Sequence, residues 1–229
     1  MIPLNNRLKT VAKYIKHQTL ADIGSDHAYL PLYALENKLI KNAVAGEVVI
    51  GPYEAAVENV SKYGASARID VRLGSGLSVI KSSEVDVITI CGMGGPLIAD
   101  ILTQGKEKLN NFPRLILQSN IHTEAVRETL VKLGYEIIAE EIIKEKKHIY
   151  EIIVAEHAEK KIHYNPSELK FGPLLMNNKN DVFYEKWDRE YQHLTKVYKK
   201  IKDETAHAEK CMQIKKEIMM IKEVLDYEN

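Results

Sequence analysis

The residues best suited to chemistry follow a short apolar run near the start of the chain. Asp22, Gly24 and Asp26 lie close together, where the run Leu20 to Ile23 gives way to a helical pattern. A glycine at such a strand-to-helix turn lets the backbone approach a ligand closely, and the helix start offers free N–H groups. The chemistry that this turn would serve is the binding of a nucleotide-like cofactor. The alternative is an Asx-type turn before an ordinary helix, with Asp26 as its N-cap.

The charge of this turn distinguishes between cofactors. Turns that bind a pyrophosphate are rich in glycine, whereas this one has a single glycine between two acids. Two carboxylates repel a pyrophosphate but attract a ligand that carries an amino group and a sulfonium. The turn therefore favours S-adenosylmethionine over NAD, with Asp22, Gly24, Ser25, Asp26 and His27 as expected contacts.

The elements that must position this turn are alternating strands and helices. Short, fully apolar runs separated by helical patterns predict a parallel, doubly wound sheet. The predicted strands are Thr19 to Ile23, Ala43 to Val48, Ile69 to Leu73, Val85 to Ile90 and Arg114 to Gln118. The predicted helices between them are Leu30 to Lys38, Tyr53 to Tyr63, Pro96 to Leu102 and Thr123 to Leu133.

Two longer strand-like runs, Gly134 to Ile143 and Lys147 to Ala155, follow these elements with only a short charged turn between them. No helix fits in that turn, so the two runs predict an antiparallel hairpin at one edge of the sheet. Five parallel strands followed by such a hairpin form the sheet of Rossmann-like S-adenosylmethionine-dependent methyltransferases, whereas an NAD-binding domain continues in parallel. The expected fold class is therefore α/β, of this methyltransferase type.

The other expected cofactor contacts lie at the carboxyl ends of the remaining strands, where a doubly wound sheet binds its ligand. Glu47 follows Gly24 at roughly the 20-residue distance at which an acid meets ribose hydroxyls. The glycine-rich segment Cys91 to Gly94 lies where a methyl donor and its target would meet. The contacts expected beside Glu47 are Val48, Gly74, Ser75, Gly76, Cys91, Gly92, Met93 and Gly94.

Three residues after the first strand are the candidates for catalysis. His27 could accept a hydrogen bond or a proton, Tyr29 could stack on a substrate, and Asp26 lies beside them. The alternative is that Tyr29 packs under its helix and His27 only touches the cofactor. The segment Cys91 to Gly94 lacks the Asn or Asp, prolines and aromatic residue that grip an exocyclic amino group. Methylation of a ring nitrogen, which needs no deprotonation, fits better.

Substrate contacts are expected from two other places. Gln118 and Asn120 end the fifth strand and could read a base edge, or they could cap the next helix. The helical pattern from Leu4 to His17 carries basic residues and no acid on its polar face. Arg7 and Lys9 on that face could contact phosphates if the substrate is a nucleic acid.

The C-terminal part of the chain changes character after a linker-like stretch near residue 160. Apolar residues recur at spacings of three and four from Phe183 to Ile201 and again from His207 to Leu225, joined by the polar stretch Lys202 to Ala206. This pattern predicts a helical coiled-coil hairpin packed on itself, and hence a monomer. A single continuous helix that dimerises is the alternative. The expected domains are residues 1–160 and 161–229.

Bulk composition excludes several classes of protein. The 229 residues are 45% hydrophobic, and Lys plus Arg and Asp plus Glu both number 32, so no overall charge indicates a nucleic-acid partner. The two cysteines, Cys91 and Cys211, lack metal-ligand spacing, so neither a disulfide framework nor a metal site is expected. The chain shows neither a signal peptide nor a membrane-spanning run, which predicts a cytoplasmic protein with no membrane partner.

Taken together, the motifs resemble the bacterial tRNA (adenine-22-N1)-methyltransferase family over essentially the whole chain. The segments that carry the resemblance are Ala21 to Pro31, Gly46 to Val49, Gly51 to Ala56, Gly74 to Leu77, Ile90 to Gly95, Leu117 to Asn120 and the C-terminal hairpin. The resemblance implies methyl transfer from S-adenosylmethionine to N1 of adenine 22 in tRNA, leaving S-adenosylhomocysteine. It also implies that the coiled coil helps to hold the tRNA.

Two other functions are compatible with the same residues. The enzyme could methylate a small molecule or a protein, with the helical hairpin as the element that sets specificity. Alternatively, the chain could be a scaffold with a vestigial pocket, although the intact acids Asp22, Asp26 and Glu47 argue against this.

Overall fold

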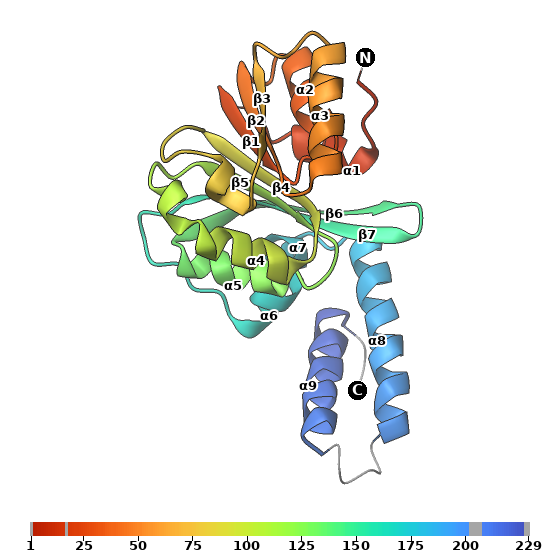
Figure 1. Cartoon of the computed structure of the whole chain (residues 1–229). Helices are drawn as coiled ribbons and strands as arrows, with labels where there is room; N and C mark the ends of the chain where they lie inside the picture. Colours follow the sequence, from red (N-terminus) through yellow and green to blue (C-terminus); the bar gives the residue numbers. More distant parts are fainter. Residues whose placement is uncertain (1, 17, 202–207, 227–229) are drawn as a thin grey trace.

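A seven-stranded sheet forms the centre of the computed structural model, which describes residues 2–16, 18–201 and 208–226 (Figure 1). The strand order is β3-β2-β1-β4-β5-β7-β6. The first five strands run parallel, and β7 is antiparallel to both of its neighbours. The strands are β1 (Thr19–Ile23), β2 (Asn42–Glu47), β3 (Ile69–Leu73), β4 (Val87–Met93), β5 (Arg114–Ser119), β6 (Tyr135–Glu145) and β7 (His148–His157). This confirms the predicted fold class.

Helices cover both faces of the sheet and bury a separate apolar core on each (Figure 1). On one face lie α1 (Asn6–Ala12), α2 (Tyr29–Glu36) and α3 (Ile50–Lys62), whose buried residues include Val11, Leu30 and Val60. On the other lie α4 (Gly95–Gln104) and α5 (Glu124–Lys132), with the short 3-10 helices η1 (Gly76–Val79) and η2 (Lys106–Leu109). The apolar runs of β1, β2, β4 and β5 are therefore mostly buried on both sides, whereas β3, at the edge of the sheet, is only partly buried.

Helix α1 is shorter at both ends than the sequence pattern predicts. The Asn5 side chain accepts a hydrogen bond from the backbone N–H of Leu8, so Asn5 is the N-cap and the helix cannot begin at Leu4. At the other end, the N–H groups of Lys13 and Tyr14 bond to carbonyls only three residues back, which closes the helix after Ala12. His17, the end of the predicted helix, lies outside the described residues.

Strand β4 is longer than predicted and contains an irregularity. The sequence places the strand at Val85 to Ile90, but it begins at Val87 and continues to Met93. Cys91 pairs with Gln118 and Met93 pairs with Ser119, so Gly92 is an extra residue in β4. A β-bulge of this kind bends a strand and redirects its side chains, and bulges are common beside active sites.

The C-terminal helices form the predicted hairpin. Helix α8 (Asp181–Ile201) and helix α9 (Ala208–Val224) lie side by side, and two short helices, α6 (Pro166–Phe171) and α7 (Pro173–Asn177), precede them (Figure 1). The predicted connection, Lys202 to Ala206, and His207 lie outside the described residues.

The base of the hairpin packs on the sheet rather than only on itself. A third apolar cluster joins the hairpin to Ile142 of β6, and its other members are Phe171, Leu175, Phe183, Trp187, Ile221, Val224 and Leu225. Part of the predicted heptad stripe therefore faces the sheet. The division of the chain at residue 160 stays a prediction. Among the described residues, no helix is both long and apolar enough to cross a membrane.

The third cluster gives a stability prediction. Phe171 is fully buried, and its ring meets that of Trp187 edge to face with centroids 4.6 Å apart. We expect Phe171→Ala to lower the free energy of unfolding by about 3–5 kcal/mol, because the change leaves a cavity. Chemical denaturation measures this. The control Met219→Ala, at a residue that is 61% exposed, should change it by less than about 0.5 kcal/mol. Equal losses in both variants would contradict the assignment.

Candidate active site

Polar side chains meet at the carboxyl ends of β1, β4 and β5. Asp22, at the end of β1, is buried, with 3% of its surface exposed. Its Oδ1 accepts a hydrogen bond of 2.6 Å from the hydroxyl of Thr89, and its Oδ2 accepts one of 2.7 Å from the hydroxyl of Ser25. Burial raises the pKa of Asp22, although these two bonds act in the opposite direction. Asp22 therefore ties the turn to β4 through these two hydrogen bonds, in addition to carrying an acidic group.

The turn after β1 has an unusual backbone. Asp26, His27 and Ala28 all have positive φ angles, of 43°, 67° and 59°, although none is glycine. Such consecutive left-handed residues are strained and persist only where their surroundings hold them. Here the carboxylate of Glu47 accepts the backbone N–H of Asp26 at 2.5 Å. The N-cap of α2 is Ala28 with no side-chain bond, so the interpretation of Asp26 as a helix cap is wrong.

Strand β2 ends at Glu47, and Val48, the predicted end, is the first residue after the strand. Glu47 is 6% exposed, and burial raises its pKa, while the bond from Asp26 lowers it. A carboxylate has a second oxygen and several lone pairs, so Glu47 can also accept from a ligand hydroxyl. Val48 is 65% exposed and Leu73, at the end of β3, is 51% exposed. Exposed apolar surface beside a buried acid suits the ribose and adenine of a nucleoside.

The segment Gly74 to Gly76 lies beside the end of β2. The N–H of Gly74 donates to the carbonyl of Glu47 at 2.7 Å, so the turn after β3 is tied to the predicted ribose-binding residue. Ser75 is exposed and leads into η1. These residues are therefore brought together with Glu47 and Val48.

The glycines after β4 allow close contacts within the protein. A Cβ atom on Gly95 would lie 1.9 Å from the backbone oxygen of His122, so only glycine lets α4 start against the loop after β5. Met93 touches Gly24 in the first turn, because a Cβ atom on Gly24 would lie 2.3 Å from the Met93 methyl carbon. Gly94 is the N-cap of α4. The backbone that approaches Gly95 so closely is therefore that of the loop after β5.

Cys91 lies in β4, the strand between β1 and β5, and pairs with Gln118 of β5. It packs partly buried against the core on the α1 side. Burial raises the pKa of its thiol, so the thiol keeps its proton at neutral pH. The cysteine thus contributes packing and no nucleophile here.

An amide network at the end of β5 brings three predicted substrate residues together. Gln118 is fully buried, and its Oε1 accepts from the guanidinium of Arg7 and from the N–H of Gly92, the latter at 2.9 Å. Its Nε2 donates to Oδ1 of Asn120 at 3.1 Å, and Nδ2 of Asn120 donates to the carbonyl of Gly92 at 2.8 Å. The network therefore fixes the β4 bulge against β5 and leaves Asn120 at its exposed end.

The remaining predicted residues lie elsewhere. Lys9 is exposed on α1, two residues after Arg7. His27 is 3.5 Å from the carboxylate of Asp26, and its ring centroid is 5.8 Å from that of Tyr29. Tyr29 is half-buried and packs against the core under α2. These contacts place His27 and Tyr29 with the β1 and β2 ends of the site.

Two residues of this site were not predicted from the sequence. Thr89, in the middle of β4, holds Asp22, and Tyr150 of β7 lies under the guanidinium of Arg7, 5.4 Å from the ring centroid. A threonine within the apolar run of β4 is a usable signal, because a fully buried strand rarely carries a hydroxyl without a partner. Tyr150 gives no such signal, since tyrosine is common in strands.

The donor set fits one kind of cofactor. Buried carboxylates at two strand ends suit a cationic nucleoside ligand, and the exposed apolar side chains beside them suit its adenine. None of the described residues form a group of three or more His, Cys, Asp or Glu side chains that could hold a metal ion. The fold and the site together define a Rossmann-like, S-adenosylmethionine-dependent methyltransferase.

Comparison with known proteins gives the family. The family model described as tRNA (adenine(22)-N(1))-methyltransferase matches residues 20–223. The tRNA (adenine(22)-N(1))-methyltransferase of Bacillus subtilis (strain 168) is 44% identical, over 99% of this chain and 98% of that protein. The chain belongs to the tRNA (adenine(22)-N(1))-methyltransferase family.

Solved structures agree with this assignment. The crystal structure of the B. subtilis m1A22 tRNA methyltransferase is 43% identical with a TM-score of 0.94, over 99% of this chain and 100% of that chain. A Streptococcus pneumoniae protein, described as a putative tRNA (m1A22) methyltransferase in complex with S-adenosyl-L-methionine, is 41% identical with a TM-score of 0.89, over 97% and 100%. M. capricolum TrmK, in complex with S-adenosyl-homocysteine, is 32% identical with a TM-score of 0.87, over 97% and 98%.

The buried carboxyl of Asp22 gives a pH prediction. Because burial raises its pKa, the folded protein holds this proton more tightly than the unfolded chain, and the group costs stability as pH rises through the folded pKa. Asp22→Asn cannot ionise. We therefore expect the free energy of unfolding of the variant, relative to wild type, to increase from about pH 4 to about pH 7 in urea titrations. A difference that falls with pH would contradict this.

The Asp22→Asn variant also tests whether Asp22 contributes to cofactor binding. We expect Asp22→Asn to weaken S-adenosylhomocysteine binding about tenfold or more in calorimetry, because a hydrogen bond to a charged group contributes about 1.5–3 kcal/mol. Asp100→Asn, at an exposed residue of α4, is the matched control and should bind as wild type does.

Proposed function

We propose that this chain transfers a methyl group from S-adenosylmethionine to N1 of adenine 22 in tRNA and releases S-adenosylhomocysteine. The observation that carries the proposal is the family match over nearly the whole chain, together with a methyltransferase sheet whose strand ends carry the expected acids and amides. The chain is thus a tRNA-modifying enzyme, and its methyl donor is S-adenosylmethionine.

The residues proposed to hold the cofactor form three groups. Glu47, with Val48 and the turn at Gly74, Ser75 and Gly76, would bind the ribose and adenine. Asp22, Gly24, Ser25, Asp26 and His27 would face the charged amino acid end. The third group is the segment after Ile90, namely Cys91, Gly92, Met93 and Gly94, which would lie closest to the reacting methyl group. Their grouping at adjacent strand ends supports this assignment.

The proposed chemistry needs alignment more than proton transfer. When bound, the cofactor supplies an electrophilic methyl group on a sulfonium. N1 of adenine carries an in-plane lone pair and can attack that carbon without first losing a proton, while the sulfur keeps the electron pair of the bond that breaks. The positive charge therefore moves from sulfur to the adenine ring. Holding the two partners in line and excluding water supplies the catalysis.

The amide network is proposed to hold the target base. Asn120 is exposed at the end of the network and is held from behind by Gln118 and Gly92, so its orientation is fixed before the substrate arrives. Adenine 22 must leave its stack to reach this point. The roles of His27, Tyr29 and Asp26 as catalytic residues stay proposals, and their contacts favour cofactor binding.

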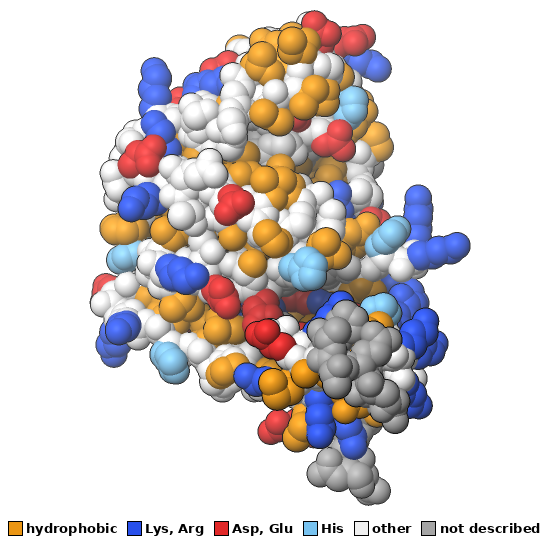
Figure 2. Space-filling model, turned by 60° about the horizontal axis from the view of Figure 1, so that its bottom comes forward, with side chains coloured by type: hydrophobic (Ala, Val, Ile, Leu, Met, Phe, Trp, Pro, Cys, Tyr) orange, Lys and Arg blue, Asp and Glu red, His pale blue; other side chains and the backbone are white. Residues whose placement is uncertain are grey.

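Phosphate contacts are proposed for two basic surfaces. Arg7 joins the network from α1, and Lys9 is exposed on the same helix. Lys and Arg side chains also gather around the end of the helical hairpin on the face shown in Figure 2. The exposed lysines there include Lys196, Lys199 and Lys200, whereas Lys202 lies outside the described residues. Such patches let a chain with no net charge bind tRNA.

A cytoplasmic monomer is the proposed state of the enzyme. Helices α8 and α9 pack on each other and on the sheet, so the apolar residues at the base of the hairpin are covered within one chain. We expect light scattering to give the mass of one chain, 26.1 kDa, over a range of protein concentrations. A mass that rises towards twice this value would contradict the monomer. The cytoplasm is proposed because the substrate is tRNA.

The substrate assignment has a direct test. We expect the purified protein to transfer labelled methyl groups to a tRNA transcript with adenine at position 22, and to leave the same transcript with guanine at that position unlabelled. Mapping the modified base should give 1-methyladenine. Equal labelling of the two transcripts would contradict the proposal, and labelling of protein or small molecules instead would favour the alternative substrate class.

A further inference from the structure

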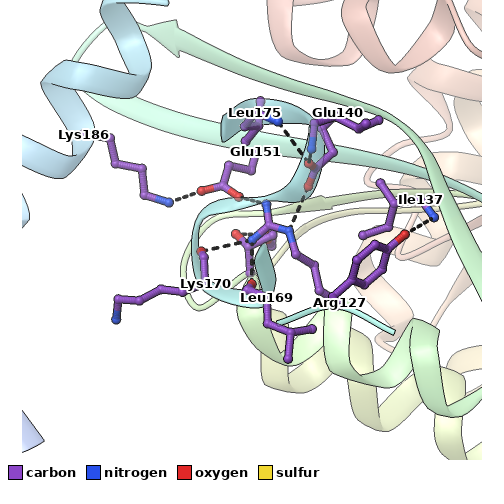
Figure 3. A network of polar contacts seen from close by, with 12 residues as sticks. Arg127, Ile137, Glu140, Glu151, Leu169, Lys170, Leu175 and Lys186 are labelled. Carbon is purple, nitrogen blue, oxygen red and sulfur yellow. Dashed lines mark hydrogen bonds and ion pairs between the residues drawn. The ribbon is translucent and has the colours of Figure 1, made fainter. Parts of the chain in front are cut away.

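Four charged side chains meet between the sheet and the helical hairpin, and they are called here the charge quartet: Arg127, Glu140, Glu151 and Lys186 (Figure 3). Arg127 of α5 donates to Glu140 of β6 at 2.8 Å and to Glu151 of β7. The other oxygen of Glu151 accepts from Lys186 of α8. One carboxylate therefore bridges a helix of the sheet domain and a helix of the hairpin.

The quartet is electrically balanced, and three of its four side chains are buried, whereas that of Lys186 is 28% exposed. The side chains of Arg127 and Glu140 have no exposed surface, and that of Glu151 is 1% exposed. Two positive and two negative charges cancel within the group. Lys186 and Arg127 hold the pKa of Glu151 below its usual range against the effect of burial, so this carboxylate stays charged.

A continuous chain of contacts connects the quartet to the amide network of the active site. Gln118, in that network, is followed by Ser119, whose hydroxyl hydrogen-bonds that of Thr123 at 2.7 Å. The N–H of Arg127 donates to the carbonyl of Thr123 at 3.2 Å, in the first turn of α5. In the sheet, Ser119 is also paired directly with Glu151. The quartet and the substrate end of β5 are thus held by the same residues.

The quartet also fixes the connection that leads to the hairpin. Arg127 donates to the carbonyls of Leu169 and Lys170 in α6, and Glu140 accepts the N–H of Leu174 in α7 at 2.9 Å. Gly172, between these helices, has a φ of 94°, and a Cβ atom there would lie 2.7 Å from both Arg127 and Glu140. Only glycine lets the chain turn this close to the quartet.

A cleft separates the loop after β5, residues 120–123 and called here the substrate loop, from the hairpin, and Lys186 lies in its wall. The cleft has a volume of about 360 Å³, with Asn120 and His122 on one side and Trp187, Glu190 and Glu217 on the other. The ammonium group of Lys186 lies 4.5 Å from the centroid of the Trp187 ring. The bond between Lys186 and Glu151 therefore ties α8 to β7 in the wall of this cleft.

We propose that the charge quartet is a positioning device, which holds the helical hairpin at one orientation to the substrate loop so that bound tRNA presents its target base. This rests on the proposed function. Buried ion groups contribute little net stability compared with apolar packing, but they penalise wrong arrangements strongly, because each alternative leaves a charge unpaired. The third apolar cluster stabilises the packing of the hairpin on the sheet, and the quartet fixes the orientation of the hairpin.

The test separates positioning from stability. In Lys186→Met, the apolar stem is kept and the bridge to Glu151 is lost. We expect the dissociation constant for tRNA, and the KM for tRNA, to rise about 5- to 100-fold, with kcat at saturating tRNA reduced less than kcat/KM. Binding of S-adenosylhomocysteine should stay within about twofold of wild type. Lys186→Arg, which can still reach the carboxylate, should restore most of the tRNA affinity.

A second variant distinguishes positioning from simple charge attraction. Glu151→Gln removes a negative charge, so attraction to the tRNA backbone alone predicts tighter binding. Positioning predicts weaker binding, because Lys186 loses its charged partner and Arg127 loses one of its two. Lys132→Met, at an exposed lysine of α5 with the same charge change as Lys186→Met, is the matched control and should behave as wild type.

The outcomes are distinguishable from failure of the proposed function. Normal tRNA affinity in Lys186→Met, or tighter binding by Glu151→Gln, would overturn the positioning role while leaving the wild-type methylation of adenine 22 intact. If Glu151→Gln fails to bind S-adenosylhomocysteine, its active site is disturbed and its tRNA affinity is not interpretable. The tRNA affinities of Lys186→Met and Lys186→Arg then decide whether the quartet has a positioning role. A wild-type protein that ignores tRNA would instead contradict the proposed function.

Discussion

The insertion of β7 between β5 and β6 is the constraint on which both the site and the hairpin depend. Because side chains alternate along a strand, neighbouring residues of β7 serve opposite faces of the sheet. Tyr150 lies under Arg7 on the α1 side, and Glu151 meets Arg127 on the α5 side. The pairing of Glu151 with Ser119 places both at the carboxyl end of β5. A parallel final strand would need a crossover connection and could not follow β6 through a tight turn.

Asp22 and Glu47 support the cofactor turn in different ways. Each carboxylate oxygen of Asp22 accepts one hydroxyl group, which supports the turn from below, while Glu47 holds the strained backbone of Asp26 in place. The strain and the buried charge are stabilised by surrounding structure, which leaves the turn fixed before any ligand binds. This arrangement accounts for a ligand loop with one glycine: the backbone is held open by side-chain bonds instead of by glycine flexibility.

How far the sequence predicts the fold depends on which contacts form each element. The strand Ile69 to Leu73 and the strand Thr19 to Ile23 have the predicted bounds, since their apolar runs end at turns. The predicted end of β4 at Ile90 is wrong because the bulge at Gly92 depends on pairing with Gln118 of β5. Helix α1 is shorter than its apolar spacing because Asn5 caps it. Long-range pairing and local capping overrode the periodicity in these two places.

By itself, the sequence determined the order of the elements, the faces they bury and the strand ends at which a cofactor would bind, because these follow from local periodicity and turn residues. Only the tertiary structure decided which partner each polar side chain takes. Arg7 meets Gln118 across 111 positions of the chain, and Arg127 reaches Glu151 across 24. Such pairs are set by strand order and register, which bring together residues that no local pattern relates. For the same reason, the charge quartet and the role of Tyr150 became visible only in the folded chain.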